Sequence, residues 1–261
     1  MTRFVLTFAV VIFAAKAQSS FREPAAPGGT SYFLLDANQR TVLALDWRDA
    51  AAAVPVGSLV KPFIAITYGQ RHRMRFPVHD CSGGDCWLKT GHGRIGLVEA
   101  IAYSCNSYFL QLAGDVPPAG VSEVVERFGM HGPPPDSGRD TLFGIGSAWR
   151  LTPFEVARAY AELAARRTEP GIAEVVAGMR LAANIGTAAA LGPALHGAPA
   201  LAKTGTAPCS HSPKAAADGY TVVVYPGDSP RYVLLVQVHG VVGREAAETA
   251  ARLLPIAVGE R

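Results

Sequence analysis

The sequence predicts an α+β fold, in which an antiparallel sheet is formed from both ends of the chain and a helical region is inserted between its strands. Two observations lead to this prediction. Short apolar runs bounded by turn residues occur between residues 32 and 46 and again after residue 200, whereas the patterns between them are helical. The hydrophobic content of 49%, with 17% charged residues, is also typical of a packed globular chain.

The first residues are typical of a secretory signal peptide. Arg3 supplies a positive charge, residues 4–15 are almost all apolar, and the A-K-A triplet at 15–17 matches a small-x-small cleavage site. The apolar run is shorter than the ~20 residues that span a bilayer. This favours cleavage after Ala17 and export over the alternative, an uncleaved membrane anchor.

These observations divide the chain into a signal peptide at 1–17, a flexible leader at 18–29 and one domain at 30–261. The leader is polar and contains proline and glycine. The net charge of +3 comes mostly from scattered arginines, without a run of Lys and Arg. A nucleic-acid partner is therefore not expected.

The domain is predicted to begin with a β-hairpin, because two apolar runs flank the polar residues 38–40. The P-V-G stretch at 55–57 then breaks the chain before an apolar-rich helix, and residues 71–93 are expected to be irregular. The elements expected in this half are strands at Tyr32–Ala37 and Thr41–Asp46, and helices at Ser58–Tyr68, Leu97–Tyr103, Asn106–Ala113 and Val121–Phe128.

The second half opens with clear signals for a helix over 153–166. Thr152 can cap this helix, Pro153 occupies its first position, and Glu155 adds negative charge to its first turn. A G-D-S-P turn follows at 227–230. The other elements expected here are a helix at Ile172–Asn184, strands at Ala200–Thr206, Tyr220–Tyr225 and Tyr232–His239, and a helix at Glu245–Leu254.

The first candidate functional motif is S-L-V-K at residues 58–61. A helix places side chains three residues apart on one face, so Lys61 can take the proton that makes the Ser58 hydroxyl a poor nucleophile. Burial among apolar neighbours would lower the pKa of this lysine, as the role requires. The alternative is a serine that caps the helix and a lysine that faces solvent.

The second motif is S-C-N at residues 104–106, at a break between two predicted helices. Ser104 and Asn106 can face one cleft, where a hydroxyl relays a proton and an amide holds a lysine and a substrate. The alternative is an ordinary helix cap, since Ser and Asn favour such positions.

The third motif is K-T-G-T at residues 203–206, on a predicted strand. A glycine inside a strand, here Gly205, often indicates close approach by a ligand or by another backbone. Lys203, Thr204 and Thr206 would then receive a substrate carboxylate. The alternative is a turn at the end of a strand.

Two of the four cysteines, Cys81 and Cys86, flank a turn-forming S-G-G-D stretch. We predict a disulfide between them, with a zinc-binding pair as the alternative. Neither a second C-x-x-C nor a close histidine pair accompanies them, so no metal site and no organic cofactor are expected. The pairing of Cys105 and Cys209 stays open, and His92 is interpreted as structural.

In this order, the S-x-x-K, S-x-N and K-T-G motifs resemble those of the penicillin-binding protein and serine β-lactamase superfamily. The segments P-V-G-S-L-V-K-P-F at 55–63, S-C-N-S-Y-F at 104–109 and K-T-G-T-A at 203–207 are similar to penicillin-binding protein transpeptidase domains. The resemblance extends from about residue 30 to the C-terminus. It implies a β-lactamase/transpeptidase-like fold.

The resemblance implies a penicillin-binding acyl-transferase that acts on D-alanyl-D-alanine stem peptides of peptidoglycan, with β-lactams as covalent inhibitors. Ser58 would form the acyl-enzyme, Lys61 would be the general base, and Ser104 and Asn106 would relay protons and orient the substrate. Lys203 would complete the catalytic set and help bind the terminal carboxylate, and the substrate-binding residues would be Thr204, Gly205 and Thr206. The N–H groups of Ser58 and Thr206 would form the oxyanion hole.

Several activities remain open under this resemblance. An amine acceptor would make the protein a D,D-transpeptidase, whereas water would make it a D,D-carboxypeptidase or a serine β-lactamase. The compact spacing of the motifs is nearer that of class D β-lactamases, but Asn106 stands where those enzymes usually carry an aliphatic residue. The remaining hypothesis is a non-catalytic penicillin-binding sensor or scaffold with a cell-wall protein partner.

Overall fold

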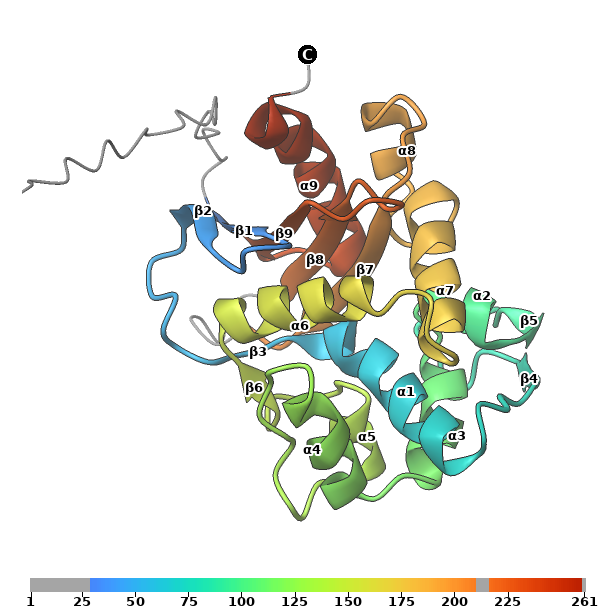
Figure 1. Cartoon of the computed structure of the whole chain (residues 1–261). Helices are drawn as coiled ribbons and strands as arrows, with labels where there is room; N and C mark the ends of the chain where they lie inside the picture. Colours follow the sequence, from blue (N-terminus) through green and yellow to red (C-terminus); the bar gives the residue numbers. More distant parts are fainter. Residues whose placement is uncertain (1–28, 210–215, 260–261) are drawn as a thin grey trace, which may run out of the picture.

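A computed structural model describes residues 29–209 and 216–259. The predicted signal peptide and all but the last residue of the predicted leader lie outside the described residues. An antiparallel sheet of five strands has the order β2-β1-β9-β8-β7, so strands from both ends of the chain are neighbours (Figure 1). Its strands are β1 (Thr30–Asp36), β2 (Val42–Asp46), β7 (Leu201–Ala207), β8 (Asp218–Tyr225) and β9 (Tyr232–His239). The structure thus confirms the predicted α+β fold.

Helices fill the chain between β2 and β7, and one more follows β9. Each long helix predicted from the sequence is present, and α6 begins at the capping box that Thr152 forms with Glu155. The helices are α1 (Lys61–Arg71), α2 (Leu97–Ala102), α3 (Asn106–Gly114), α4 (Pro118–Glu126), α5 (Arg139–Leu142), α6 (Pro153–Ala165), α7 (Ile172–Asn184), α8 (Leu191–Ala194) and α9 (Gly243–Val258), and a 3₁₀ turn, η1 (Gly57–Val60), leads into α1.

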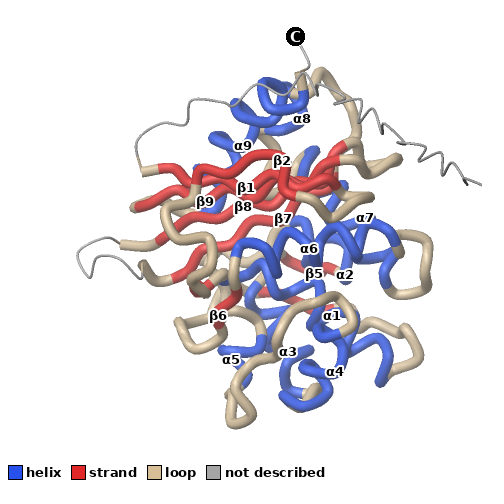
Figure 2. Tube along the Cα trace, turned by 60° about the vertical axis from the view of Figure 1, so that its left-hand side comes forward, coloured by secondary structure: helices blue, strands red, loops and turns tan. Residues whose placement is uncertain are grey.

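The sheet separates two hydrophobic cores, because successive side chains of a strand face opposite sides of a sheet. On β1, Phe33 and Leu35 belong to the core shared with α1 and α6, whereas Tyr32 and Leu34 pack with α9. Figure 2 shows α8 and α9 on one side of the sheet and the other inserted helices on the opposite side. The sheet therefore forms the middle layer, and most of the inserted region covers one of its faces.

Short strand pairs are the main elements that the sequence did not predict. Within and beside the segment expected to be irregular, β4 (His79–Cys81) pairs with β5 (Gly93–Ile95). In the same way, β3 (Val54–Pro55) pairs with β6 (Arg150–Leu151). Strands of two or three residues are too short for a period of two to show in the sequence.

The helices contain no membrane-spanning candidate within the described ranges 29–209 and 216–259: none of them is both long and apolar enough to cross a bilayer.

Candidate active site

The first motif lies where the sheet meets the helical region. Ser58 belongs to η1 rather than to the α-helix that was predicted to start there, and Lys61 follows as the first residue of α1. Pro62 occupies the first turn of α1, where a missing N–H costs no hydrogen bond. The hydroxyl of Tyr160, on α6, donates a hydrogen bond of 2.7 Å to the carbonyl of Leu59. Helix α6 thereby fixes the turn that carries Ser58, which is partly exposed.

Lys61 is completely buried, and its amine is held by the second motif. Its Nζ donates to the backbone oxygen of Ser104 at 2.8 Å and to Asn106 Oδ1 at 2.6 Å, and Ser104 Oγ lies 3.4 Å away. The rings of Phe109 and Phe143 lie 5.3 and 5.6 Å from the same nitrogen. Burial lowers the pKa of Lys61 to about 7, although the nearby Cys105 and Cys86 act in the opposite direction. A neutral amine that can accept a proton is therefore accessible near neutral pH.

Ser104 connects the second motif to the third. It lies between α2 and α3 with a φ of +53°, in the left-handed region that non-glycine residues seldom adopt. Lys203 Nζ donates to Ser104 Oγ at 2.8 Å and to the carbonyl of Thr204 at 2.7 Å. Burial and the nearby charge of Lys61 hold the pKa of Lys203 well below its usual range. Because Ser104 Oγ accepts from both lysines, its own proton is available for donation.

The third motif lies on β7, an edge strand of the sheet, and packs directly against the turn that carries Ser58. A Cβ atom on Gly57 would lie 2.3 Å from the backbone oxygen of Thr206, and one on Gly205 would lie 2.5 Å from that of Val56. Only glycines permit this contact. The close approach predicted at Gly205 is thus an approach by another backbone segment.

The two threonines of the third motif differ in their surroundings. Thr206 is exposed, and its Oγ1 accepts a hydrogen bond of 2.9 Å from the N–H of Gly243. Thr204 is buried, and its hydroxyl donates to Thr187 Oγ1 at 2.7 Å. The hydroxyl of Thr206, rather than that of Thr204, is accessible to a ligand in this structure.

Comparison with protein families identifies this arrangement. Residues 30–254 match the family model of the penicillin binding protein transpeptidase domain. The chain belongs to this family. No curated protein sequence matches this transpeptidase domain.

Solved structures of other penicillin-binding proteins share the fold of this transpeptidase domain. Penicillin-binding protein 2 of Pseudomonas aeruginosa, solved in complex with WCK 5153, is 18% identical with a TM-score of 0.73, covering 87% of this chain and 70% of that chain. Penicillin-binding protein 2 of Helicobacter pylori, in complex with MreC, is 17% identical with a TM-score of 0.72. The match covers 88% of this chain and 59% of the Helicobacter pylori chain. The transpeptidase domain of Burkholderia pseudomallei penicillin-binding protein 3 is 17% identical with a TM-score of 0.69. The match covers 88% of this chain and 86% of the Burkholderia pseudomallei chain.

Sequence reasoning missed several residues that support the site of this transpeptidase domain. Tyr160, Thr187 and Gly243 each hydrogen-bond to a motif residue or to its neighbour. Phe109 and Phe143 cover the amine of Lys61. All five lie far from their partners along the chain, so the local sequence around them carries no signal of these contacts.

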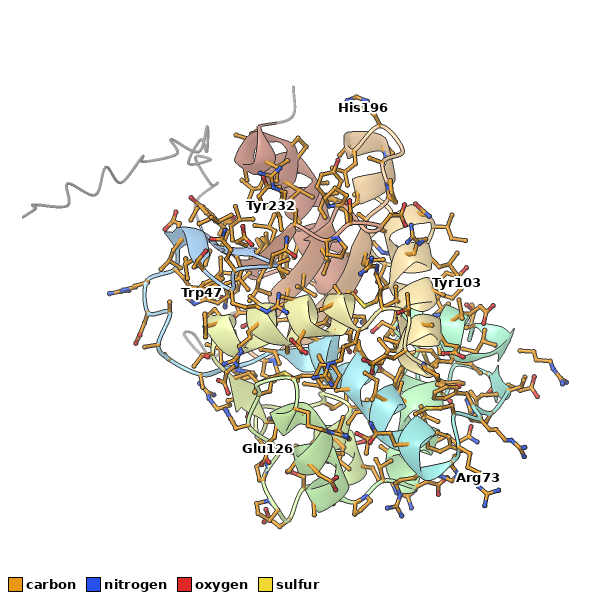
Figure 3. The ribbon with its side chains drawn as sticks, in the orientation of Figure 1. Trp47, Arg73, Tyr103, Glu126, His196 and Tyr232 are labelled. Carbon is orange, nitrogen blue, oxygen red and sulfur yellow. The ribbon has the colours of Figure 1, made fainter. Side chains whose placement is uncertain are left out.

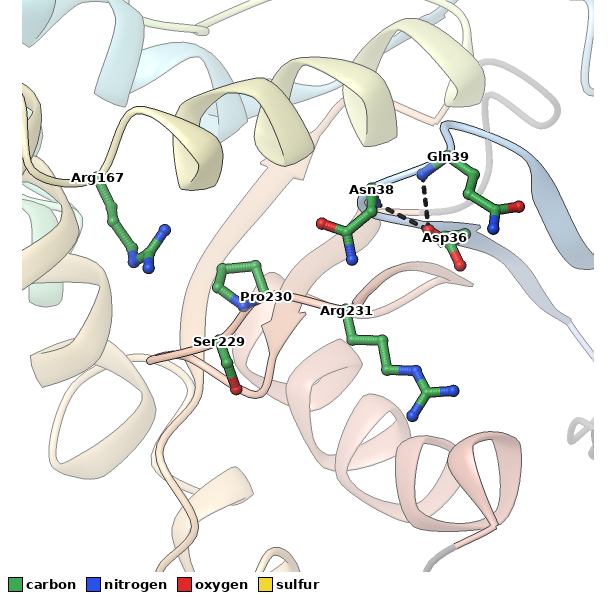
Figure 4. Close-up of a pocket in the computed structure, with 7 residues that line it drawn as sticks. All are labelled: Asp36, Asn38, Gln39, Arg167, Ser229, Pro230 and Arg231. Carbon is green, nitrogen blue, oxygen red and sulfur yellow. Dashed lines mark hydrogen bonds between the residues drawn. The ribbon is translucent and has the colours of Figure 1, made fainter.

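A surface hollow lies away from the three motifs (Figure 4). Its volume is about 620 Å³, and it is lined at the turns between β1 and β2 and between β8 and β9, including Asp36 and Arg231. Asp36 pairs with Tyr232 at one end of the sheet, whereas Thr206 pairs with Gly219 toward the other. The candidate site is therefore defined by its hydrogen-bond network and not by this hollow.

The structure corrects the disulfide prediction for Cys81 and Cys86. Both are free thiols, as is Cys105. The sulfur atoms of Cys81 and Cys86 are not bonded to each other. They lie 3.6 and 3.5 Å, respectively, from His92 Nδ1. The loop is therefore organised around His92, which the sequence analysis interpreted as structural.

Proposed function

We propose that this transpeptidase domain is a penicillin-binding serine acyl-transferase that acts on D-alanyl-D-alanine stem peptides of peptidoglycan through an acyl-enzyme on Ser58. One observation carries the proposal. Lys61, one helical turn after Ser58, is fully buried with a pKa of about 7, and its amine is held by Ser104 and Asn106. An amine in this state can act as a general base at neutral pH.

In the proposed acylation, Lys61 takes the proton of Ser58 as Oγ attacks the carbonyl carbon of the penultimate D-alanine. The backbone N–H groups of Ser58 and Thr206 would stabilise the oxyanion, and the close packing of η1 on β7 supports this pairing. As the C–N bond breaks, Ser104 donates its proton to the leaving nitrogen and recovers one from the Lys61 ammonium, whose Nζ lies 3.4 Å from Ser104 Oγ. The released product is D-alanine, and the peptide remains as an ester on Ser58.

Substrate would bind along the outer edge of β7, the last strand of the sheet, where Thr206 is exposed. An extended peptide can add to an edge strand through backbone hydrogen bonds. The Lys203 amine and the exposed hydroxyl of Thr206 would donate hydrogen bonds to its terminal carboxylate. Thr204 would not bind the carboxylate through its hydroxyl, because this hydroxyl donates a hydrogen bond to Thr187 Oγ1.

Deacylation decides the final activity. An amine from a second stem peptide would give a cross-link, and water would give carboxypeptidase activity. A β-lactam would acylate Ser58 by opening of its ring amide, and rapid hydrolysis of that ester would make the protein a β-lactamase. The proposal includes export to the periplasm or the outer face of the cell. It also includes a cell-wall protein partner, by analogy with the Helicobacter pylori relative in complex with MreC.

The first test follows the intact mass of the protein after mixing with a penicillin. A persistent adduct on the wild type, absent from Ser58→Ala, is expected for a penicillin-binding transpeptidase or carboxypeptidase. The matched control is Ser229→Ala, a change in the exposed turn between β8 and β9, which should acylate like the wild type. A transient adduct with rapid hydrolysis of the drug would indicate a β-lactamase. No adduct on folded protein would exclude the proposed enzyme and favour a scaffold.

A further inference from the structure

A cluster of sulfur and nitrogen atoms lies behind the second motif. Its members are Cys81, Cys86, His92 and Cys105, whose nearest ligand atoms all lie within 4.8 Å of one another. The cysteine side chains are almost fully buried, with 2%, 4% and 0% of their surface exposed in chain order. A compact group of three buried thiols and one imidazole has no role in the proposed acyl transfer.

The distances in this cluster agree with a tetrahedron around one ion. Zinc–sulfur bonds of about 2.3 Å and zinc–nitrogen bonds of about 2.0–2.1 Å place tetrahedral ligands roughly 3.8 Å apart for two sulfurs and roughly 3.6 Å apart for sulfur and nitrogen. The sulfurs of Cys86 and Cys105 are separated by 3.8 Å. His92 Nδ1 lies 3.6 Å from Cys81 Sγ and 3.5 Å from Cys86 Sγ. Two sulfurs joined in a disulfide would be separated by only about 2.05 Å.

The local fold brings these ligands together. Because β4 and β5 are paired, Cys81 lies opposite Gly93, the neighbour of His92. The loop between the strands folds back tightly: a Cβ atom on Gly91, which has a φ of +74°, would lie 2.0 Å from the carbonyl oxygen of Cys81. The ring of His92 stacks on Tyr103, at the end of α2, with centroids 5.6 Å apart (Figure 3 labels Tyr103). The ring is thereby held with Nδ1 toward the sulfurs.

We propose that this chain binds one structural Zn²⁺ ion. Its ligands are Cys81 Sγ, Cys86 Sγ, His92 Nδ1 and Cys105 Sγ. A set of three thiolates and one imidazole is typical of zinc, and four protein ligands leave no open position for a substrate. On binding, each thiol loses its proton to solvent, and the ion neutralises most of the resulting charge. This proposal replaces both the disulfide and the expectation that the chain has no metal site.

The ion would act on the second motif through Cys105. This residue is the N-cap of α3 and lies between Ser104 and Asn106, which hold the amine of Lys61. Ser104 has the left-handed φ of +53°, a conformation that persists only where its surroundings enforce it. A bond from zinc to Cys105 would tie this peptide to the β4–β5 loop. The metal is then a positioning group for the motif and takes no part in the chemical step.

The direct test is the metal content of the full chain, purified in reductant without added metal and analysed by inductively coupled plasma mass spectrometry. We expect about one zinc per chain. Cys86→Ser, which removes a loop ligand, should lose most of this zinc during dialysis against a chelator. Ser229→Ala, a change in the exposed turn between β8 and β9, should keep it. The proposal would be overturned if the wild type failed to retain zinc even after incubation with zinc chloride and dialysis. Equal loss of zinc from the two variants would also overturn it.

A second test uses the wild type alone and so does not depend on how a variant folds. Replacement of zinc by Co²⁺ should produce sulfur-to-cobalt charge-transfer absorption together with the intense visible bands of tetrahedral cobalt. Alkylation in denaturant with a chelator but no reductant should then label all four cysteines of the protein. Octahedral cobalt spectra, or a disulfide between Cys81 and Cys86 that blocks two thiols, would contradict the site.

The effect on the second motif is tested with labelled penicillin, and only this test rests on the proposed function. Removal of zinc should slow the acylation of Ser58, and added Zn²⁺ should restore it. If acylation is the same with and without the metal, the coupling to the motif is excluded. If the protein holds zinc but is not acylated in either state, the proposed function fails while the zinc site stands.

Discussion

Lys203 Nζ donates a hydrogen bond of 2.8 Å to Ser104 Oγ, although the two residues are 99 positions apart in the chain. This bond joins the strand that would bind substrate to the residue that would protonate the leaving nitrogen. Lys203 is fully buried, so the interaction is shielded from water.

Replacement of Lys203 by alanine is therefore expected to slow acylation by penicillin by about 5- to 150-fold, which corresponds to the loss of a buried hydrogen-bond donor, about 1–3 kcal/mol. Stopped-flow acylation rates measure the effect. The matched control is Lys89→Ala, an exposed change in the β4–β5 loop, which should acylate like the wild type. Equal rates for Lys203→Ala and the wild type would remove Lys203 from the site.

The lowered pKa of Lys61 predicts the pH dependence of acylation. The amine must be neutral to accept the proton of Ser58, so the rate should rise as the pH increases through about 7 and level off above it. Asn106→Asp would place a negative charge beside this amine, raise its pKa and move the midpoint to higher pH. Acylation rates measured across this range check both expectations. A profile that falls with increasing pH would contradict the role of Lys61.

The contact between Gly205 and Val56 predicts a steric effect. A methyl group at Gly205 would meet the backbone oxygen of Val56 at 2.5 Å and the side chain of Leu59 at 3.0 Å. Gly205→Ala should lower the free energy of unfolding by about 1–3 kcal/mol, since a well-packed interior must shift to admit the methyl group. It should also reduce acylation, because η1 is displaced from β7. Gly138→Ala adds a methyl group where no atom lies within 4 Å and should change neither quantity. Denaturant unfolding and acylation rates compare the two variants.

The sequence predicted the sheet from both chain ends and the motif residues Ser104 and Asn106 that hold the amine of Lys61, because each signal is local. Apolar runs mark the strands, and three short motifs mark the site. The cluster around His92 could not be recognised in this way. Cys86 and Cys105 are 19 positions apart in the chain. Cys105 also lies inside the second motif, where its neighbours Ser104 and Asn106 were assigned to proton relay and substrate orientation. Only the pairing of β4 with β5 and the break between α2 and α3 bring these ligands together.

Tyr160 provides a test of how the fold positions Ser58. Its hydroxyl, buried within α6, donates to the carbonyl of Leu59 at 2.7 Å, and that carbonyl belongs to the turn that carries Ser58. Tyr160→Phe keeps the ring, which packs edge-on against Phe63, but leaves the carbonyl of Leu59 without this donor. The free energy of unfolding should fall by about 1–3 kcal/mol, the cost of a buried acceptor left unpaired. Acylation should slow with little change in its midpoint pH, because the contacts of Lys61 are kept. A shift of the midpoint would show instead that Tyr160 acts on the base, and an unchanged stability would show that the bond contributes little to holding the turn.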